Sequence, residues 1–126
     1  MMLNTSPTPR VLVVDDELLI RWALREALEA KGYVVSEAED AAGARTAMTE
    51  VPDAVILDYR LPDSNDLGLL LTIRHGAPAT RVIMMTAYGS SEMIRGALDL
   101  GAYRVVSKPF EVHEIADLVA SALAAR

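Results

Sequence analysis

Four short apolar runs in this chain each end on side chains that can do chemistry. In chain order, these side chains are the pair Asp15 and Asp16, then Asp58, Thr86 and Lys108. Apolar runs of this length, bounded by turn-forming residues, are typical of strands that are buried on both faces of a parallel sheet. Ligand sites in such sheets lie at the carboxyl ends of the strands, so we expect these side chains to share one crevice.

The chemistry expected of this crevice is phosphoryl transfer beside a metal ion. Three carboxylates brought together disfavour joint ionisation, and a divalent cation relieves this. Oxygen ligands without His or Cys favour Mg²⁺ over zinc or copper, and Mg²⁺ leaves room for phosphate oxygens. The Lys108 amine, the Thr86 hydroxyl and the Ala87 backbone N–H can all donate to a phosphoryl group. Asp58 stands alone at its strand end, so it is the predicted nucleophile that forms an aspartyl phosphate.

The segments between the apolar runs have helical spacing, so strands and helices alternate along the chain. The first helix is expected to start at Glu17, with Asp16 as its cap, Gly32 just past its end and Trp22 packed inside. Asp40 and either Ser90 or Ser91 are predicted to cap later helices. This alternation predicts an α/β fold, a parallel sheet with helices on both faces. The expected strands are 10–15, 33–38, 54–58, 81–86 and 103–107.

Length and composition narrow the classes of protein. The 126 residues suit one domain, and the absence of cysteine excludes disulfides and thiolate metal sites. The net charge of −6 argues against nucleic-acid binding by this domain. No apolar run approaches the roughly 20 residues of a membrane span. We therefore expect a cytoplasmic domain over 10–126, after a disordered N-terminal tail over 1–9 that is not a signal peptide.

The full set of motifs resembles the receiver domain of two-component response regulators. It consists of Asp15-Asp16, Asp58, Thr86-Ala87 and Lys108-Pro109-Phe110, in the family's order and spacing. The resemblance implies a five-stranded doubly wound sheet of the flavodoxin-like type, with strand order 2-1-3-4-5. The segment 61–67 is most similar to receivers attached to transcriptional activators.

The resemblance also assigns roles to individual residues. Asp58 would accept a phosphoryl group from a sensor histidine kinase, and Thr86 and Lys108 would contact that group. Asp16 and Asp58 would bind Mg²⁺, together with the Arg60 carbonyl and with Asp15 either directly or through a metal-bound water.

The function implied by the resemblance is a phosphorylation-activated switch. Phosphorylation would change the face made by the last two helices and the last strand. That face would control a partner, homodimerisation or an appended transcription-regulating domain. The only reactions expected of the domain itself are its own phosphorylation and slow dephosphorylation, so we do not expect an enzyme in the usual sense.

Three departures from the family pattern carry their own predictions. Val105 stands where receivers usually have Tyr or Phe, so Tyr88, or Tyr103 on the same strand face as Val105, is expected to report the switch instead. Asp66 replaces the usual glycine of the loop after the acceptor strand, which predicts a different loop backbone. Arg60 and Tyr88 are bulky residues beside the expected path of the hydrolytic water, which predicts slow loss of phosphate.

Two other functions compete with the switch. Phosphatases of the haloacid-dehalogenase type also use an aspartyl nucleophile, but they need a second Asp two residues later, where this chain has Arg60. A degenerate receiver that acts as a phosphate-independent interaction module is favoured by Val105. The complete set of acids, Thr86 and Lys108 argues against it.

Overall fold

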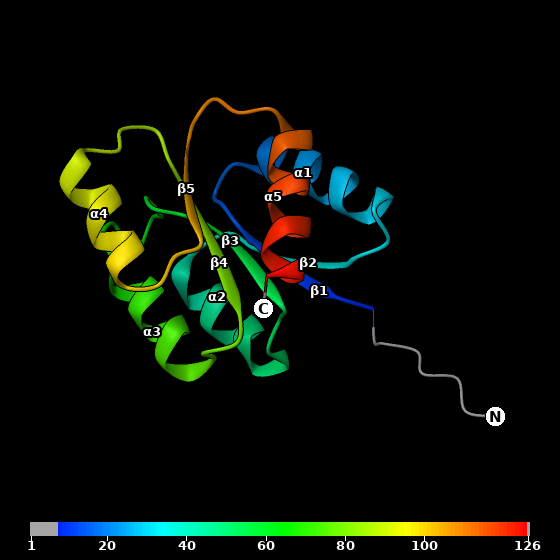
Figure 1. The fold of residues 1–126 in the computed structure, drawn as a ribbon, viewed down its shortest axis with the longest axis horizontal. Coiled ribbons are helices and arrows are strands. Elements are labelled where there is room, and N and C mark those ends of the chain that lie inside the picture. Colours follow the sequence, from blue (N-terminus) through cyan, green and yellow to red (C-terminus); the bar gives the residue numbers. More distant parts are fainter. Residues whose placement is uncertain (1–7, 126) are drawn as a thin grey trace.

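The computed structural model describes residues 8–125, and most of the expected tail over 1–9 lies outside them. Its centre is a five-stranded parallel sheet with the order β2-β1-β3-β4-β5 (Figure 1). The predicted α/β fold class and strand order are confirmed. The strands are β1 (Arg10–Val14), β2 (Val34–Ala38), β3 (Ala54–Asp58), β4 (Arg81–Thr86) and β5 (Arg104–Ser107).

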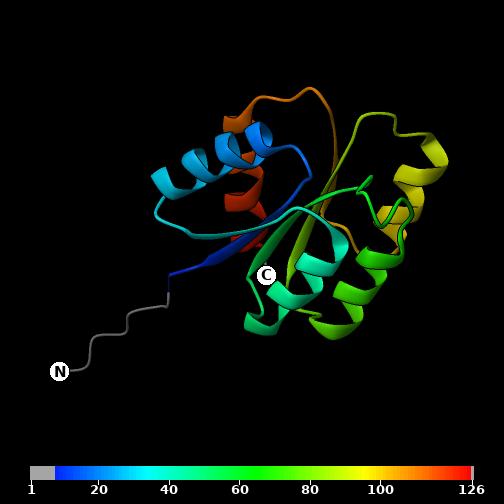
Figure 2. The ribbon, with the colours of Figure 1, turned by 180° about the vertical axis from the view of Figure 1, so that it is seen from behind.

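Helices cover both faces of this sheet. One face carries α1 (Leu18–Ala30) and α5 (Val112–Ala124), which contact each other (Figures 1 and 2). The other face carries α2, α3 and α4. Each of the helices α1 to α4 lies in a crossover that returns the chain to the start of the next parallel strand, and α5 follows the last strand. The remaining bounds are α2 (Ala41–Ala47), continued by the 3₁₀ turn η1 (Met48–Glu50), then α3 (Gly68–Gly76) and α4 (Ser91–Asp99).

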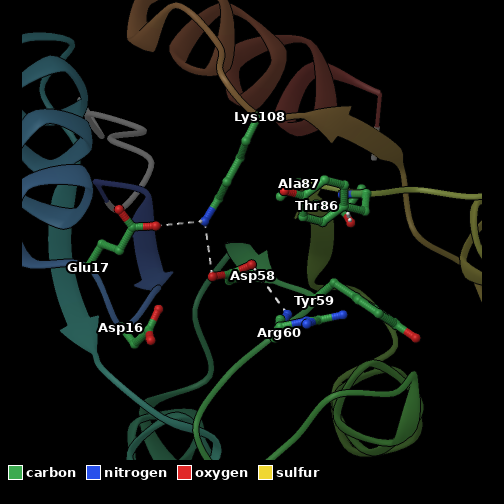
Figure 3. Close-up of a pocket in the computed structure, with 9 residues that line it drawn as sticks. Asp16, Glu17, Asp58, Tyr59, Arg60, Thr86, Ala87 and Lys108 are labelled. Carbon is green, nitrogen blue, oxygen red and sulfur yellow. Dashed lines mark hydrogen bonds and ion pairs between the residues drawn. The ribbon is translucent and has the colours of Figure 1, made fainter.

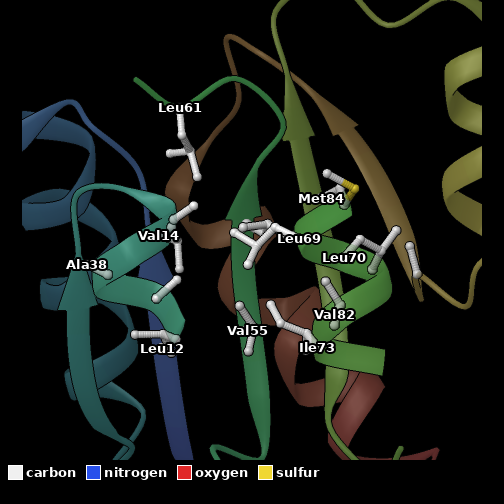
Figure 4. Packing of buried hydrophobic residues seen from close by; sticks show 14 of the residues in the cluster. Leu12, Val14, Ala38, Val55, Leu61, Leu69, Leu70, Ile73, Val82 and Met84 are labelled. Atoms are coloured by element: carbon white, nitrogen blue, oxygen red, sulfur yellow. The ribbon is translucent and has the colours of Figure 1, made fainter. Parts of the chain in front are cut away.

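Side chains that alternate along the strands build one apolar core on each face of the sheet. Leu12 and Val55 point to the side of α2 and α3 (Figure 4). Val13 and Ile56 point to the opposite side, toward α1 and α5. β3 is the central strand of the sheet, and all five of its residues are buried. The register pairs Val14 with Leu57, so Asp15 and Asp58 are the next residues on adjacent strands. None of the helices in residues 8–125 is long and apolar enough to cross a membrane.

The helix ends follow the predictions in most places. Asp40 and Ser90 are the N-cap residues of α2 and α4, and each side chain accepts a backbone N–H three residues later. Gly32, after the end of α1, has a φ of 91°, which favours glycine. Asp16 is not the cap of α1, because the N-cap residue is Glu17, whose N–H donates to Asp15 Oδ1 at 2.8 Å.

Two predicted positions are wrong. Trp22 is 59% exposed and does not fill the core. Tyr103 precedes the regular part of β5, so strict alternation does not reach it. It packs on the side of α1 and α5, whereas Val105 packs on the opposite side. The guanidinium groups of Arg81 and Arg104 both lie near the Tyr103 ring.

The loop after β3 keeps an ordinary backbone at Asp66. Among residues 8–125, Val51 is the only non-glycine residue with a positive φ, so the loop needs no left-handed conformation where the family has glycine. The Asp66 carboxylate instead accepts the N–H of Gly68 at 2.8 Å, at the start of α3. The same loop is tied to α2 because the Asp63 carboxylate accepts the N–H groups of Ala41 and Ala42.

Candidate functional site

The predicted residues meet in a cleft at the carboxyl ends of β1, β3 and β4. The cleft has a volume of about 260 Å³ and is open to solvent. Asp58 lies at its floor, with Asp16 and Glu17 on one wall and Thr86 and Ala87 on the other (Figure 3). The lining is completed by Tyr59, Arg60, Tyr88 and Lys108.

Lys108 joins two strand ends through its amine. Its Nζ donates to Asp15 Oδ2 at 2.9 Å. It also donates to Asp58 Oδ2 at 3.1 Å and lies 3.6 Å from Glu17 Oε1 (Figure 3). Asp15 is fully buried and Asp58 is 5% exposed, so both carboxylates depend on this one cation. The chain brings Lys108 here because the backbone N–H of Lys108 bonds to the Thr86 carbonyl, which extends the pairing of β4 with β5.

The electrostatics of the cleft are dominated by burial and by excess negative charge. Burial raises the pKa of Asp58, the nearby charge of Asp15 raises it further, and the hydrogen bond from Lys108 only partly offsets these effects. Burial opposes the charge of Lys108, but its hydrogen bonds to Asp15 and Asp58 outweigh this and raise its pKa. The ammonium therefore stays charged at neutral pH, and the charged form of Asp58 is less favourable than that of a solvent-exposed aspartate.

The opposite wall offers hydrogen-bond donors and two bulky side chains. The Thr86 hydroxyl, on a side chain that is 3% exposed, accepts the N–H of Tyr88 at 3.3 Å. The N–H of Arg60 points to Asp58 Oδ1 at 3.3 Å. The Tyr88 side chain is 87% exposed at the mouth of the cleft. All the residues singled out from the sequence for this site therefore lie at or beside one cleft.

Comparison with known proteins identifies the family. The sequence model of the response regulator receiver domain family matches residues 11–120 of this chain. This chain belongs to the response regulator receiver domain family. It is 37% identical over 111 residues to sporulation initiation phosphotransferase F of Bacillus subtilis (strain 168), which covers 87% of this chain and 90% of that protein.

Some relatives are much longer than this chain, and others have about the same length. The DNA-binding transcriptional regulator NtrC of Escherichia coli (strain K12) is 35% identical over 114 residues, which is 90% of this chain but 24% of NtrC. The crystal structure of a CheY-like receiver domain protein from Methanospirillum hungatei JF-1 matches with a TM-score of 0.87 and 28% identity. That match covers 94% of this chain and 96% of the other. This receiver thus resembles both stand-alone domains and the receiver portion of longer regulators.

The acidic wall of this receiver has a donor set that suits a divalent cation. Asp15, Asp16 and Glu17 each offer a carboxylate oxygen, and these oxygens all lie within 4.8 Å of one another. Clustered hard oxygen donors, two of them on exposed residues, match the preference of Mg²⁺. Asp58 is not part of this cluster, and Lys108 binds both Asp15 and Asp58.

Glu17 is the residue of this wall that the sequence interpretation missed. It lies directly after the acid pair, but helical spacing made it look like an ordinary first-turn residue. The signal that was available is the uninterrupted acidic triplet at a strand end. Only the tight turn, in which the Glu17 N–H bonds to Asp15, brings the third carboxylate toward the cleft.

Proposed function

We propose that this receiver domain, residues 10–126, is a phosphorylation-activated switch that accepts a phosphoryl group on Asp58. The observation that carries the proposal is the position of Lys108, whose single amine joins the buried Asp15 and Asp58 carboxylates below an open cleft. A carboxylate of raised free energy at the floor of such a cleft is suited to attack phosphorus. The resemblance to sporulation initiation phosphotransferase F supports group transfer as the chemistry.

The transfer exchanges one bond to phosphorus for another. An Asp58 carboxylate oxygen forms a bond to the phosphorus of a phosphohistidine, and the phosphorus–nitrogen bond breaks. The leaving imidazole keeps the bonding electron pair and takes a proton from solvent. Mg²⁺ would be held by Asp15, Asp16, Asp58 and the Arg60 carbonyl, with Glu17 as a further carboxylate offered by the acidic turn. When bound, it would supply charge neutralisation for the phosphoryl oxygens.

Three groups of this chain would then hold the product. The Lys108 ammonium pairs with a phosphoryl oxygen, and the Thr86 hydroxyl and the Ala87 N–H donate to others. The Thr86 hydroxyl, which accepts the N–H of Tyr88 at 3.3 Å, would turn toward the cleft to donate its proton to a phosphoryl oxygen. The loop that follows β4 moves with it. We propose that this movement changes the conformation of the face made by α4, β5 and α5. That face would in turn control homodimerisation or a transcription-regulating partner.

The direct test is intact-mass analysis after incubation with a small phosphodonor such as acetyl phosphate. We expect one added phosphoryl group with Mg²⁺, far less without it, and none on Asp58→Asn. Asp99→Asn is a matched control, because Asp99 is an exposed acid outside the cleft at the end of α4, and it should be phosphorylated normally. Phosphorylation of Asp58→Asn to the same extent as the parent would refute the assignment. No phosphorylation of the parent by any donor would favour the phosphate-independent module.

The proposed kinase contact lies beside the cleft on α1. Leu18, Leu19 and Trp22 are exposed by 66%, 78% and 59%, an unusual gathering of apolar side chains on one short segment. A groove next to them runs from Leu19 to Phe110 and reaches Lys108. An apolar patch that borders the acceptor fits the helices of a sensor histidine kinase, which must bring a phosphohistidine to Asp58.

This contact can be separated from the chemistry. Leu19→Asp should abolish transfer from the kinase but leave phosphorylation by acetyl phosphate unchanged. Leu71→Asp, a change at an apolar side chain exposed by 42% on the remote helix α3, is the control and should affect neither reaction. Equal transfer from kinase to parent and Leu19→Asp would place the contact elsewhere.

A further inference from the structure

Arg21 lies one turn inside α1 and reaches back to the acidic turn. Its Nη1 donates to the backbone carbonyl of Asp15 at 2.7 Å, and its Nε donates to Glu37 Oε1 at 3.1 Å. The side chain is only 11% exposed. A guanidinium that is held at two points in this way has little freedom, so the carbonyl that it binds is also fixed.

Glu37 sets the orientation of this guanidinium from the edge strand β2. Burial would raise the pKa of Glu37, but hydrogen bonds from Arg25 and Arg21 outweigh it and lower the pKa, so the carboxylate is ionised at neutral pH. Arg25, one turn further along α1, binds the same carboxylate and also Glu29. Among the described residues, Arg25 donates to Glu37 and Glu29 but to no atom of the acidic turn, so it shares the contact with Glu37 without the contact to the Asp15 carbonyl. A change at Arg25 therefore separates these two contacts.

The Asp15 carbonyl is the point where this network acts on the cleft. It belongs to the peptide that joins Asp15 to Asp16, so its direction sets where Asp16 and Glu17 lie. The same turn is closed by the N–H of Glu17 on Asp15 Oδ1 at 2.8 Å and by the N–H of Arg21 on the Glu17 carbonyl at 3.1 Å. Arg21 therefore completes a ring of hydrogen bonds around the turn that gathers three carboxylates.

We propose that Arg21, oriented by Glu37, is a positioning residue that holds the acidic turn in the conformation needed to bind Mg²⁺. The role in metal binding rests on the proposed function, whereas the role in fixing the turn does not. The sign of the effect separates positioning from simple charge. Removal of a cation near a cluster of acids should tighten binding of Mg²⁺ if only charge matters, but it should weaken binding if Arg21 positions the ligands.

The experiment compares Arg21→Met and Arg21→Lys with the parent and with Arg25→Met. Binding of Mg²⁺ is measured by calorimetry. Exchange of the Glu17 amide is measured by NMR in metal-free protein, and unfolding in urea reports on the fold as a whole. Arg21→Lys keeps the charge but cannot donate to the Asp15 carbonyl and Glu37 with the same fork, and it remains informative if Arg21→Met does not fold.

We expect Arg21→Met to weaken Mg²⁺ binding by about tenfold and to speed exchange of the Glu17 amide by about fivefold. Arg21→Lys should change both in the same direction, and Arg25→Met should change neither. Unchanged or tighter binding in Arg21→Met would overturn the proposal, as would equal effects in Arg25→Met.

The outcome remains interpretable if the proposed function fails. In that case the parent binds no Mg²⁺, and exchange of the Glu17 amide decides alone whether Arg21 fixes the turn. Equal exchange rates in the parent and in both Arg21 variants would then refute the positioning role.

Discussion

Replacement of Asp58 by Asn should stabilise the metal-free protein, although it removes the proposed acceptor. Asp58 Oδ2 and Asp15 Oδ2 lie 3.1 Å and 2.9 Å from the same amine, so the two oxygens are within about 6 Å of each other. At an effective dielectric constant of about 20, their repulsion is roughly 3 kcal/mol and the attraction of Asp58 to Lys108 is roughly 5 kcal/mol. Burial of the carboxylate costs several kcal/mol more.

Repulsion from Asp15 and the cost of burial together exceed the attraction of Lys108, so ionisation of Asp58 is unfavourable in the folded protein. This agrees with the raised pKa of Asp58. The Asp58→Asn variant would keep a polar amide beside Lys108, and the ammonium would still be paired with Asp15. We therefore expect Asp58→Asn to increase the free energy of unfolding by about 1–2 kcal/mol at pH 7.

The effect must depend on pH in one direction. A carboxyl group whose pKa is raised in the folded state contributes its full stability below its unfolded pKa of about 3.9. That contribution is lost as the pH rises through the folded pKa. The gain from Asp58→Asn should therefore be largest near neutral pH and should disappear below about pH 4.

Urea unfolding in EDTA is the suitable assay, because guanidinium chloride would screen the charges. Glu26→Gln, which removes one exposed acid from the middle of α1, is the control and should change little. Mg²⁺ should stabilise the parent by about 2.7 kcal/mol at a concentration one hundred times the Kd of the parent, and it should stabilise Asp58→Asn by less. A less stable Asp58→Asn at pH 7, or a gain that persists at pH 4, would refute the electrostatic reasoning.

Three further predictions concern the cleft, a strained residue and the core. Arg60→Ala should lose phosphate severalfold faster than the parent in an intact-mass time course, because the change removes a bulky side chain that lines the cleft. An equal rate would contradict the prediction that Arg60 shields the phosphoryl group from water. Val51 has a φ of 33° and is 57% exposed, so Val51→Asn should relieve backbone strain and raise the free energy of unfolding by about 1 kcal/mol, seen as a higher urea midpoint. A lower midpoint would show that no strain is stored there. Leu70→Ala should lower the free energy of unfolding by about 2–5 kcal/mol, because the side chain is fully buried. Leu71→Ala, at a neighbouring residue that is 42% exposed, should lower it far less. Equal losses would contradict the assignment of Leu70 to the core.

Much of this fold is predictable because its signals are local. Short apolar runs indicate strands, and apolar residues spaced three or four apart indicate helices. Each of these patterns is contained within one short segment of the chain. Asp40, Ser90 and Gly32 mark helix ends through their own side chains or backbone preference. The prediction for Tyr103 failed because it assumed regular alternation one residue before β5 begins. Trp22 was misplaced because an apolar side chain on a helix can face a partner as well as the core.

The sequence by itself determined which residues could do chemistry. A parallel sheet brings the carboxyl ends of its strands to one edge. The position of each residue at the end of a strand was therefore enough to predict that Asp15, Asp58, Thr86 and Lys108 lie near one another. Their contacts were decided only by the tertiary structure. Lys108 meets two acids that are 93 and 50 residues away, and Arg21 meets Glu37 across 16 residues. Such contacts depend on register, turn geometry and burial, which set distances to within an ångström and which no local pattern encodes.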